Sequence, residues 1–276
     1  MAMPISRAVR MTRTAISPRL AIRIFFGTNT YLVEAMTPSK PSSVPIWPIG
    51  WTVRHVAETG STNDDLVAAA RAGAPDRTVI VADYQTAGKG RLDRTWESRR
   101  GSNLLVSLLF RYESHHPSRF SRIVALAARA ACERLGNVRV SVKWPNDLII
   151  GDHKLGGLLA VGAPQERFVV VGIGVNVGWA PDGAVALSSL ETPLELLAEM
   201  LREIDARLGL NDSVLREEHK SVLATLGSKV RVELRKGEFL VGMATDLDEL
   251  SRLMVVDETG QRHVVDVGDV VHLRAQ

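Results

Sequence analysis

Cysteine is almost absent from this chain of 276 residues, which contains only Cys132, in a segment typical of a helix. A single cysteine excludes a disulfide framework, a C-x-x-C redox motif and a zinc site built on several thiolates. No apolar run approaches the roughly 20 residues that a membrane span requires. We therefore expect a cytoplasmic protein with no membrane partner.

Several catalytic signatures are also missing. The sequence has no G-x-S-x-G, no H-E-x-x-H and no His/Cys cluster with metal-ligand spacing, which disfavours hydrolases and zinc enzymes and leaves any metal ligand unknown. The basic glycine loop at Gly88 and Lys89 fits neither common phosphate loop. A P-loop would need glycine at Asp83 and Ser/Thr at Gly90, and a dinucleotide fingerprint would need glycine at Asp93.

Positive charge is concentrated at the start of the chain. The net charge is +3, but residues 1–50 hold six cations and one acid, which leaves residues 51–276 with 28 cations and 30 acids. A nearly neutral folded region disfavours a general nucleic-acid binder, because such binding rests on a basic face. The Arg-rich, acid-poor start matches either an organelle transit peptide or a disordered extension, with Met11 and Met36 as alternative initiators.

The chain is expected to have three parts. Residues 1–49 end in a linker rich in proline and serine and are predicted to be a disordered extension. Residues 50–226 alternate helical and extended patterns and are predicted to form a catalytic domain. Residues 227–276 contain five short apolar runs separated by turn residues, the spacing of a small barrel.

Helices and strands of the middle part can be placed by apolar periodicity and capping. Helices are expected after Ser61 or Thr62, over Pro117 to Gly136, Pro193 to Leu208 and Asp212 to Leu226. Strands are expected over Thr78 to Asp83, Asn103 to Arg111 and up to Trp144, then in the runs GGLLAVG and FVVVGIGVNV.

Five polar segments interrupt these elements, each at a strand end or a turn. They are GSTN (60–63), QTAGKGRLDRTW (85–96), KWPND (143–147), HKLGG (153–157) and GIGVN (172–176). Each has an ordinary explanation, such as a helix cap, a proline turn or a solvated basic loop. Their joint occurrence in this order favours a functional site.

The segments together resemble the bacterial biotin protein ligases. The matching patterns are G-[RK]-G-R-x-x-R-x-W from Gly88, K-W-P-N-D from Lys143, K-[LV]-[AG]-G-[IL]-L from Lys154 and G-[IV]-G-[LVI]-N from Gly172. The resemblance runs from about residue 59 to residue 177 and continues more loosely into the C-terminal part. Two positions depart from the family pattern, since arginine is commoner at Lys89 and glycine is usual at Asp93.

The resemblance implies both a fold and an activity. The fold class is α+β, with a catalytic domain like that of class II aminoacyl-tRNA synthetases, a mixed sheet with helices, followed by a small Src-homology-3-like β-barrel. The activity is ATP- and Mg²⁺-dependent formation of biotinyl-5′-AMP from biotin, then transfer of biotin to a lysine of the biotin carboxyl carrier domain of an acyl-CoA carboxylase, such as acetyl-CoA carboxylase. A homodimer is left open, and no nucleic-acid partner is implied.

The resemblance also assigns roles, position by position. The biotin contacts are Ser61, Thr62, Asn63, Gln85, Lys89, Gly90, Arg91 and Lys154. The nucleotide contacts are Arg91, Arg94, Trp96, Lys143, Asn146, Asp147 and Asn176. The catalytic residues are Lys154, Arg91 and Lys89. The basic loop is expected to close over the acyl-adenylate, and Asp147 is a candidate base for the acceptor lysine.

Three other functions remain open. A lipoate or octanoate ligase shares the fold and the adenylate chemistry, but its R-R-x-x-G-G-G-x-V-x-H-D-like segment is missing from this sequence. A biotin-responsive DNA-binding repressor would need a winged helix, for which residues 1–50 are short and interrupted by proline. A binding module without catalysis is disfavoured by Lys154 and the two loop arginines.

Overall fold

The computed structural model divides into two compact units, Met1–Val44 and Pro45–Gln276. It describes residues 22–26, 29–33, 45–114, 116–188, 190, 192–234, 238–266 and 268–273. In the first unit, β1 (Ile22–Phe26) pairs with β2 (Asn29–Val33) in an antiparallel hairpin that the sequence analysis did not predict. The rest of the predicted extension, up to residue 44, lies outside the described residues.

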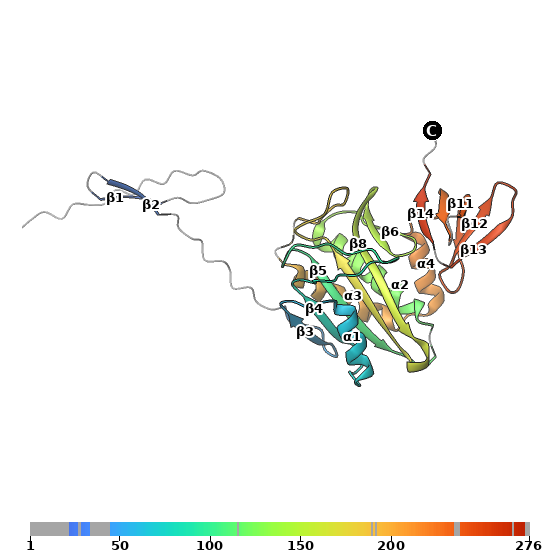
Figure 1. Ribbon diagram of the computed structural model, residues 1–276, viewed down its shortest axis with the longest axis horizontal. Coiled ribbons are helices and arrows are strands. Elements are labelled where there is room, and N and C mark those ends of the chain that lie inside the picture. The colour runs from blue at the N-terminus through green and yellow to red at the C-terminus, as the bar shows by residue number, and fades with distance from the viewer. Residues whose placement is uncertain are drawn as a thin grey trace, which may run out of the picture. The chain divides into compact units, whose positions relative to one another are not determined.

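The second unit is built on a seven-stranded mixed sheet with the order β3-β4-β5-β9-β8-β7-β6 (Figure 1). The strands are β3 (Thr52–Val56), β4 (Thr78–Ala82), β5 (Leu104–Arg111), β6 (Ser141–Lys143), β7 (Asp147–Ile150), β8 (His153–Ala163) and β9 (Phe168–Val175). Only the β3–β4 pair is parallel among the described pairs of this sheet. The mixed sheet with helices that the sequence predicts is confirmed.

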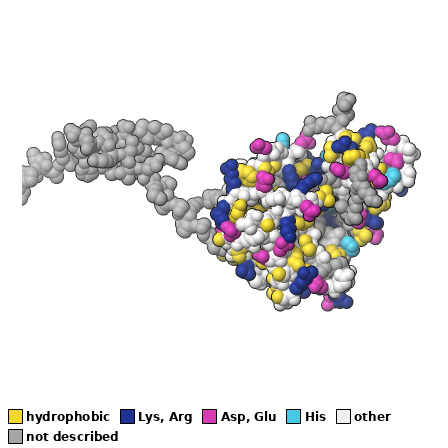
Figure 2. Space-filling view, in the orientation of Figure 1, with side chains coloured by type: hydrophobic (Ala, Val, Ile, Leu, Met, Phe, Trp, Pro, Cys, Tyr) yellow, Lys and Arg dark blue, Asp and Glu magenta, His cyan; other side chains and the backbone are white. Residues whose placement is uncertain are grey.

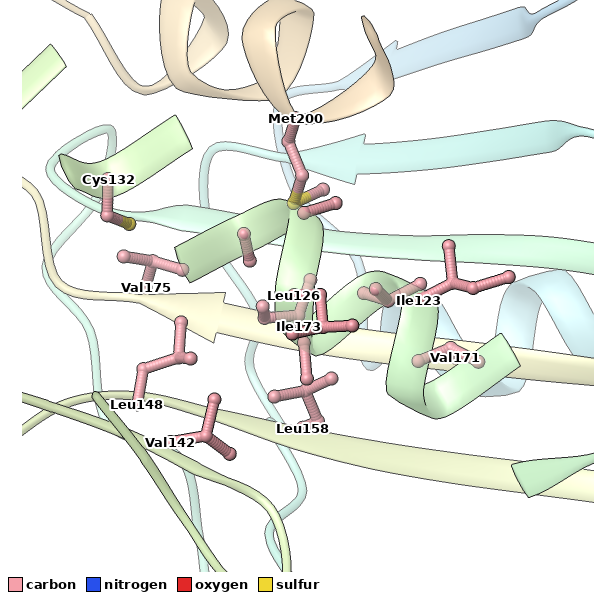
Figure 3. Packing of buried hydrophobic residues seen from close by; sticks show 14 of the residues in the cluster. Ile123, Leu126, Cys132, Val142, Leu148, Leu158, Val171, Ile173, Val175 and Met200 are labelled. Carbon is pink, nitrogen blue, oxygen red and sulfur yellow. The ribbon is translucent and has the colours of Figure 1, made fainter. Parts of the chain in front are cut away.

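Helices cover both faces of this sheet. They are α1 (Thr62–Arg71), α2 (Ser118–Gly136), α3 (Pro193–Leu208) and α4 (Asp212–Ser221), with a 3₁₀ turn at Pro164–Glu166. Side chains alternate between the faces of a strand, so Ile80 and Leu109 pack with Leu66 of α1. Their neighbours pack against α2 and α3 on the opposite face, where Figure 3 shows Leu126 and Met200 near Ile173.

The predicted helix over Asp212 to Leu226 is too long, since α4 ends at Ser221. The residues that follow pair with β6 instead, because Val142 N donates to Val222 O at 2.9 Å and Ala224 N donates to Val142 O at 2.8 Å. Backbone pairing with a buried strand therefore overrides the local helical pattern. No helix among the described residues is long and apolar enough to cross a membrane.

The C-terminal part forms a five-stranded antiparallel sheet with the order β13-β12-β11-β10-β14. Its strands are β10 (Lys229–Glu233), β11 (Phe239–Leu247), β12 (Leu253–Asp257), β13 (Arg262–Val265) and β14 (Asp269–His272). In β10 the side chains alternate, with Val230 and Val232 fully buried between exposed neighbours. This is the small C-terminal β-domain that the sequence predicts.

A buried histidine on α4 makes stability depend on pH. His219 is 5% exposed, and its Nδ1 has no hydrogen-bond partner among the described residues. Burial, reinforced by the charge of Arg122, lowers the pKa of His219 from 6.5 to about 4. The unfolded chain therefore takes up this proton below about pH 6.5, whereas the folded chain stays neutral until about pH 4.

Because the unfolded state binds more protons in this interval, stability is present above pH 6.5 and falls as the pH falls towards 4. We expect His219 to account for a loss of up to about 3 kcal/mol in the free energy of unfolding. Urea titrations at several pH values would measure it, with His219→Leu as the comparison. Equal pH slopes for the two proteins would contradict this assignment.

Candidate active site

A cavity of about 400 Å³ opens on the face of the large sheet that α1 covers, beside the N-terminus of this helix. Glycines on β9 make the room. A Cβ on Gly172 would overlap the Asn63 amide, and one on Gly174 would overlap the Trp96 indole. The floor is apolar and includes Leu105 of β5 and Leu159 of β8. Polar groups gather at the two ends of the cavity, a pattern typical of a binding site for a small molecule.

The structure brings together nearly all residues that the sequence nominates for the site. The predicted residues that line the cavity are Ser61, Thr62, Asn63, Gln85, Lys89, Gly90, Arg91, Arg94, Trp96, Lys143, Asn146, Asp147 and Lys154. They come from the N-terminus of α1 and its N-cap, the loop after β4, the β6–β7 hairpin and β8. Asn176 is the exception.

Asn176 lies behind the cavity and is 2% exposed. Its Nδ2 donates to Val185 O at 3.2 Å, and its Oδ1 accepts from Asn103 Nδ2 at 3.4 Å. Asn103 Oδ1 in turn accepts from the backbone of Val177 at 3.0 Å. These bonds hold the end of β9 against neighbouring loops, and Asn176 is not among the residues that line the cavity.

One end of the cavity is an uncharged hydrogen-bond network. Gln85 Oε1 accepts from both the backbone N and the hydroxyl of Thr62, at 2.8 and 3.0 Å. Asn63 Nδ2 donates to Leu159 O at 3.0 Å, which turns its Oδ1 towards Ser107. Ser61 is the N-cap of α1 as predicted, but its hydroxyl makes no capping hydrogen bond. This end therefore offers both donors and acceptors without charge.

Ser107 orders this network, although no motif in the sequence marks it. The side chain is fully buried on β5, with Oγ 2.7 Å from Thr62 Oγ1 and 2.7 Å from Asn63 Oδ1. Within the run NLLVSLLFR a single serine carries no recognisable signal, since its role depends on α1 packing against that face of the sheet.

Replacing Ser107 by alanine removes the hydroxyl that orients two side chains. We expect the affinity for biotin to fall about tenfold, the value of one buried hydrogen bond, with the KM for ATP unchanged. Calorimetric titration with biotin measures the effect. Ser228→Ala is a matched control, because its hydroxyl bonds Ala224 O away from the cavity. Equal biotin affinities for the two variants would exclude an ordering role for Ser107.

The basic loop is a short β-hairpin in this structure. Trp96 N donates to Gly88 O at 3.0 Å, Gly90 N donates to Arg94 O at 2.6 Å, and Arg94 N donates to Arg91 O at 3.2 Å. The two residues at its tip, Leu92 and Asp93, have φ angles of 54° and 57°. Two left-handed residues in succession are typical of a type I′ turn, which favours glycine and tolerates aspartate. The departure at Asp93 is therefore compatible with the turn.

Two cations of the loop bind other parts of the chain. Lys89 Nζ lies 2.6 Å from Asp64 Oδ2 of α1, in an exposed ion pair. Arg91 donates to Asn146 Oδ1 at 3.3 Å and to Gly268 O at 3.4 Å. Lys89 thus connects the loop to α1, and Arg91 connects it to both the K-W-P-N-D turn and the C-terminal sheet.

The other end of the cavity is strongly basic. The lining includes five cations, and Asp147 is the one carboxylate among its described residues. Lys154 Nζ lies 2.7 Å from Asp147 Oδ1 and 5.6 Å from the centre of the Trp96 ring. An excess of fixed cations in a concave site raises the local concentration of anions and stabilises phosphate oxygens.

Asp147 is also the residue that could help to hold a magnesium ion. No group of three or more His, Cys, Asp or Glu side chains among the described residues has the geometry of a metal site. Protein sites for Mg²⁺ commonly supply only one or two carboxylates, with substrate phosphates and water completing the coordination. Asp147 Oδ1 is buried and makes no aligned hydrogen bond in spite of its ion pair with Lys154. The donor set therefore fits a phosphate-bound magnesium ion.

The C-terminal sheet forms one wall of the cavity, which the sequence did not predict. Val270 and Val271 of β14 line it, and Gly268 accepts the hydrogen bond from Arg91. The site is therefore built from both the large sheet and the C-terminal sheet.

Comparison with known proteins agrees with this arrangement. Residues 59–177 match the model of the Biotin/lipoate A/B protein ligase family, and residues 225–273 match the Biotin protein ligase C terminal domain. The fold and the site thus define a two-domain ligase of the biotin/lipoate class.

Curated relatives narrow this class. The Biotin–[acetyl-CoA-carboxylase] ligase of Mycobacterium tuberculosis is 36% identical over 245 residues, which covers 82% of this chain and 91% of the relative. The Bifunctional ligase/repressor BirA of Escherichia coli is 27% identical over 226 residues, 72% of this chain and 69% of the relative. The chain belongs to the biotin protein ligase family.

Solved structures share the fold. The Biotin protein ligase from Aquifex aeolicus in complex with biotin and ATP has a TM-score of 0.68 and 25% identity, covering 81% of this chain and 99% of that one. The predicted resemblance and fold class are therefore confirmed. Among the described residues no helix precedes β3.

Proposed function

We propose that this chain is a biotin–[acetyl-CoA-carboxylase] ligase. It forms biotinyl-5′-AMP from biotin and ATP and then transfers biotin to a lysine of a biotin carboxyl carrier domain. The observation that carries the proposal is the polarity of the cavity, which has an uncharged network at Thr62 and Gln85 and, around Asn146 and Asp147, the cations Arg91, Lys143 and Lys154. Biotin has the same polarity, because its ureido ring is neutral and its valeryl chain ends in a carboxylate.

The uncharged end discriminates between the acyl substrates of the family. The ureido group has one carbonyl acceptor and two N–H donors, which match the amide and hydroxyl groups of Thr62, Asn63 and Gln85. A lipoyl or octanoyl chain has no such groups, so it would displace water from this polar end without making hydrogen bonds to it in return. The network therefore supports biotin over lipoate.

The basic end suits the adenylation step. An oxygen of the biotin carboxylate attacks the α-phosphorus of ATP, a bond to that phosphorus forms, and the bond to the departing pyrophosphate breaks. The step brings anions together, and Lys154, Arg91 and Lys143 are fixed charges that offset their repulsion. A magnesium ion held by Asp147 and the phosphates would add charge neutralisation.

The second step transfers the acyl group. The neutral amine of the acceptor lysine attacks the carbonyl carbon of the mixed anhydride, the amide bond forms as the bond from that carbon to the phosphate oxygen breaks, and AMP leaves. The amine gives up its proton to a base, for which Asp147 is the candidate. The hairpin at Arg91 excludes water from the anhydride, while Trp96 offers an aromatic face to the adenine ring. Asn176 holds the end of β9 in place beside this half of the site.

The proposal also covers the domain boundaries and the cellular location of the protein. Residues 50–226 are the catalytic domain, residues 227–276 are the second domain, and the protein acts in the cytoplasm. Figure 2 shows basic and acidic side chains interspersed over the visible face of the described residues from Pro45 onwards, which therefore presents no single basic surface of the kind that DNA binding needs.

One experiment tests the function. The protein is incubated with ATP, Mg²⁺, biotin and a biotin carboxyl carrier domain, and the mass of the carrier is measured. A gain of one biotin, absent when the acceptor lysine is replaced by arginine, supports the proposal. A gain with lipoate and none with biotin would assign the chain to the lipoate ligases.

A further inference from the structure

The loop between β11 and β12 contacts the K-W-P-N-D turn through Ser251. Ser251 O accepts from Trp144 Nε1 at 2.9 Å, and Ser251 Oγ accepts from Arg122 Nη2 at 2.6 Å and from Nε at 3.2 Å. Arg122 also donates to Glu249 O at 3.3 Å. Ser251 thus connects α2 of the catalytic domain with the tryptophan of the K-W-P-N-D turn.

The loop is built to hold Ser251 in place. Asp248 Oδ1 accepts from the backbone N of Leu250 at 3.0 Å and of Arg252 at 2.8 Å, and Asp248 Oδ2 lies 2.6 Å from Arg252 Nε. Ser251 itself has a φ of 67°, a left-handed conformation that disfavours residues other than glycine. A strained residue persists where its surroundings determine its conformation, which the bonds around Asp248 do here.

Packing of α2 against the β11–β12 loop does not by itself require the buried charge of Arg122. Arg122 is 4% exposed, and its hydrogen-bond partners among the described residues are the neutral oxygens of Ser251 and Glu249. The acid acting on it, Asp212, is paired with Arg119 and makes no ion pair with Arg122 among the described residues. Burying a guanidinium without a direct carboxylate partner opposes stability, and apolar residues of similar volume would hold the surfaces together at least as well. An arginine is suited to this position because its planar guanidinium donates two hydrogen bonds to Ser251 Oγ and so fixes the orientation of the serine.

We propose that Arg122 and Ser251 are positioning residues for the nucleotide half of the site, where they keep Trp144 and the adjoining Lys143, Asn146 and Asp147 in place. Trp144 is 3% exposed and lines the cavity between these three side chains. The same contact fixes the sheet that supplies Val270 and Gly268 to the cavity. The kinetic test of this inference rests on the proposed function. A second test, by hydrogen exchange, does not depend on enzyme activity.

The test compares two buried arginines of the same helix. Arg119 is 5% exposed on α2 and binds Asp212, Leu208 O and Leu210 O, all within the catalytic domain. Arg122→Met should raise the KM for ATP in biotin-dependent ATP–pyrophosphate exchange about tenfold and leave the KM for biotin unchanged. Arg119→Met should leave the ratio of the two KM values as it is in the unaltered protein, whatever it does to stability.

A second variant isolates the serine hydroxyl. Ser251→Gly removes Oγ and relieves the left-handed strain, so it should reproduce the effect of Arg122→Met without loss of the loop conformation. The double variant should be no worse than either single one, because both remove the same interaction. Additive effects, or a normal KM for ATP in Ser251→Gly, would overturn the proposal.

Backbone hydrogen exchange of residues 143–150 tests the same point without turnover. Exchange should be about tenfold faster in Arg122→Met than in Arg119→Met, measured on the ligand-free proteins. Equal exchange in the two variants would overturn the positioning role. If the unaltered protein shows no biotin-dependent pyrophosphate exchange, the proposed function fails, while the exchange contrast still decides the role of Arg122.

Discussion

Replacement of Lys154 by alanine is expected to slow adenylate formation by about 10²–10³-fold, the usual consequence of removing one group that stabilises developing charge. Lys154 Nζ lies in the basic half of the cavity, 2.7 Å from Asp147 Oδ1 and 5.6 Å from the Trp96 ring centre. An ammonium group at this position can follow negative charge from the attacking carboxylate to the phosphate oxygens. The stabilisation is greatest in the transition state, so the rate should fall more than the affinity for biotin.

Pyrophosphate release and calorimetric titration with biotin separate these two quantities. Lys229→Ala is a suitable control, because Lys229 is an exposed lysine paired with Glu258 outside the cavity. Asp147→Asn provides a further comparison, since it removes the charged partner of Lys154 but keeps the lysine. Normal pyrophosphate release together with weak biotin binding would show that Lys154 is a binding residue and has no role in the reaction.

Replacement of Arg91 by alanine should let the acyl-adenylate escape into solution. Arg91 holds the hairpin against Asn146 and Gly268, on two different elements, so its loss should loosen the hairpin while the fold persists. A mixed anhydride reacts with any accessible amine once its surroundings admit solvent. We expect biotin on the lysines of an inert bystander protein to increase at least about tenfold.

Streptavidin detection of the bystander protein measures this leakage. Arg99→Ala removes the same charge from the following loop, where Arg99 lies over the Trp179 ring at 5.2 Å and does not line the cavity. Leakage from both variants would point to general loosening of the loop. Unchanged bystander labelling with unchanged carrier biotinylation in Arg91→Ala would show that the hairpin does not retain the intermediate.

Local patterns were sufficient to predict the main elements. The helix expected over Pro117 to Gly136 is α2, and the strand expected over Asn103 to Arg111 contains β5, because apolar periodicity directly reports which face of an element is buried. The helix expected to end at Leu226 was wrong, because residues after Ser221 pair with β6. That pairing joins segments about 80 residues apart and leaves no signal in a local window.

The residues of the site also divide into those that local motifs predict and those that depend on long-range packing. Lys154, Arg91 and the K-W-P-N-D turn carry specific motifs, so their shared cavity could be expected from the sequence. Asn176 belongs to an equally clear motif, but it is buried and does not line the cavity, because a motif does not reveal the direction of a side chain. Ser107 has no motif and contacts two of the predicted biotin residues.

The sequence by itself determined the elements, the order of the polar segments and the family, since each of these depends on neighbouring residues or on short patterns of fixed spacing. The tertiary structure alone decided how the cavity is enclosed. Gly172 and Gly174 of β9 leave room for Asn63 and Trp96, which come from other parts of the chain. The wall at Val270 depends on the C-terminal sheet. The Arg122–Ser251 contact joins residues 129 apart in sequence. Such contacts form between segments that are far apart in sequence, so the positions of their side chains cannot be inferred from either segment alone.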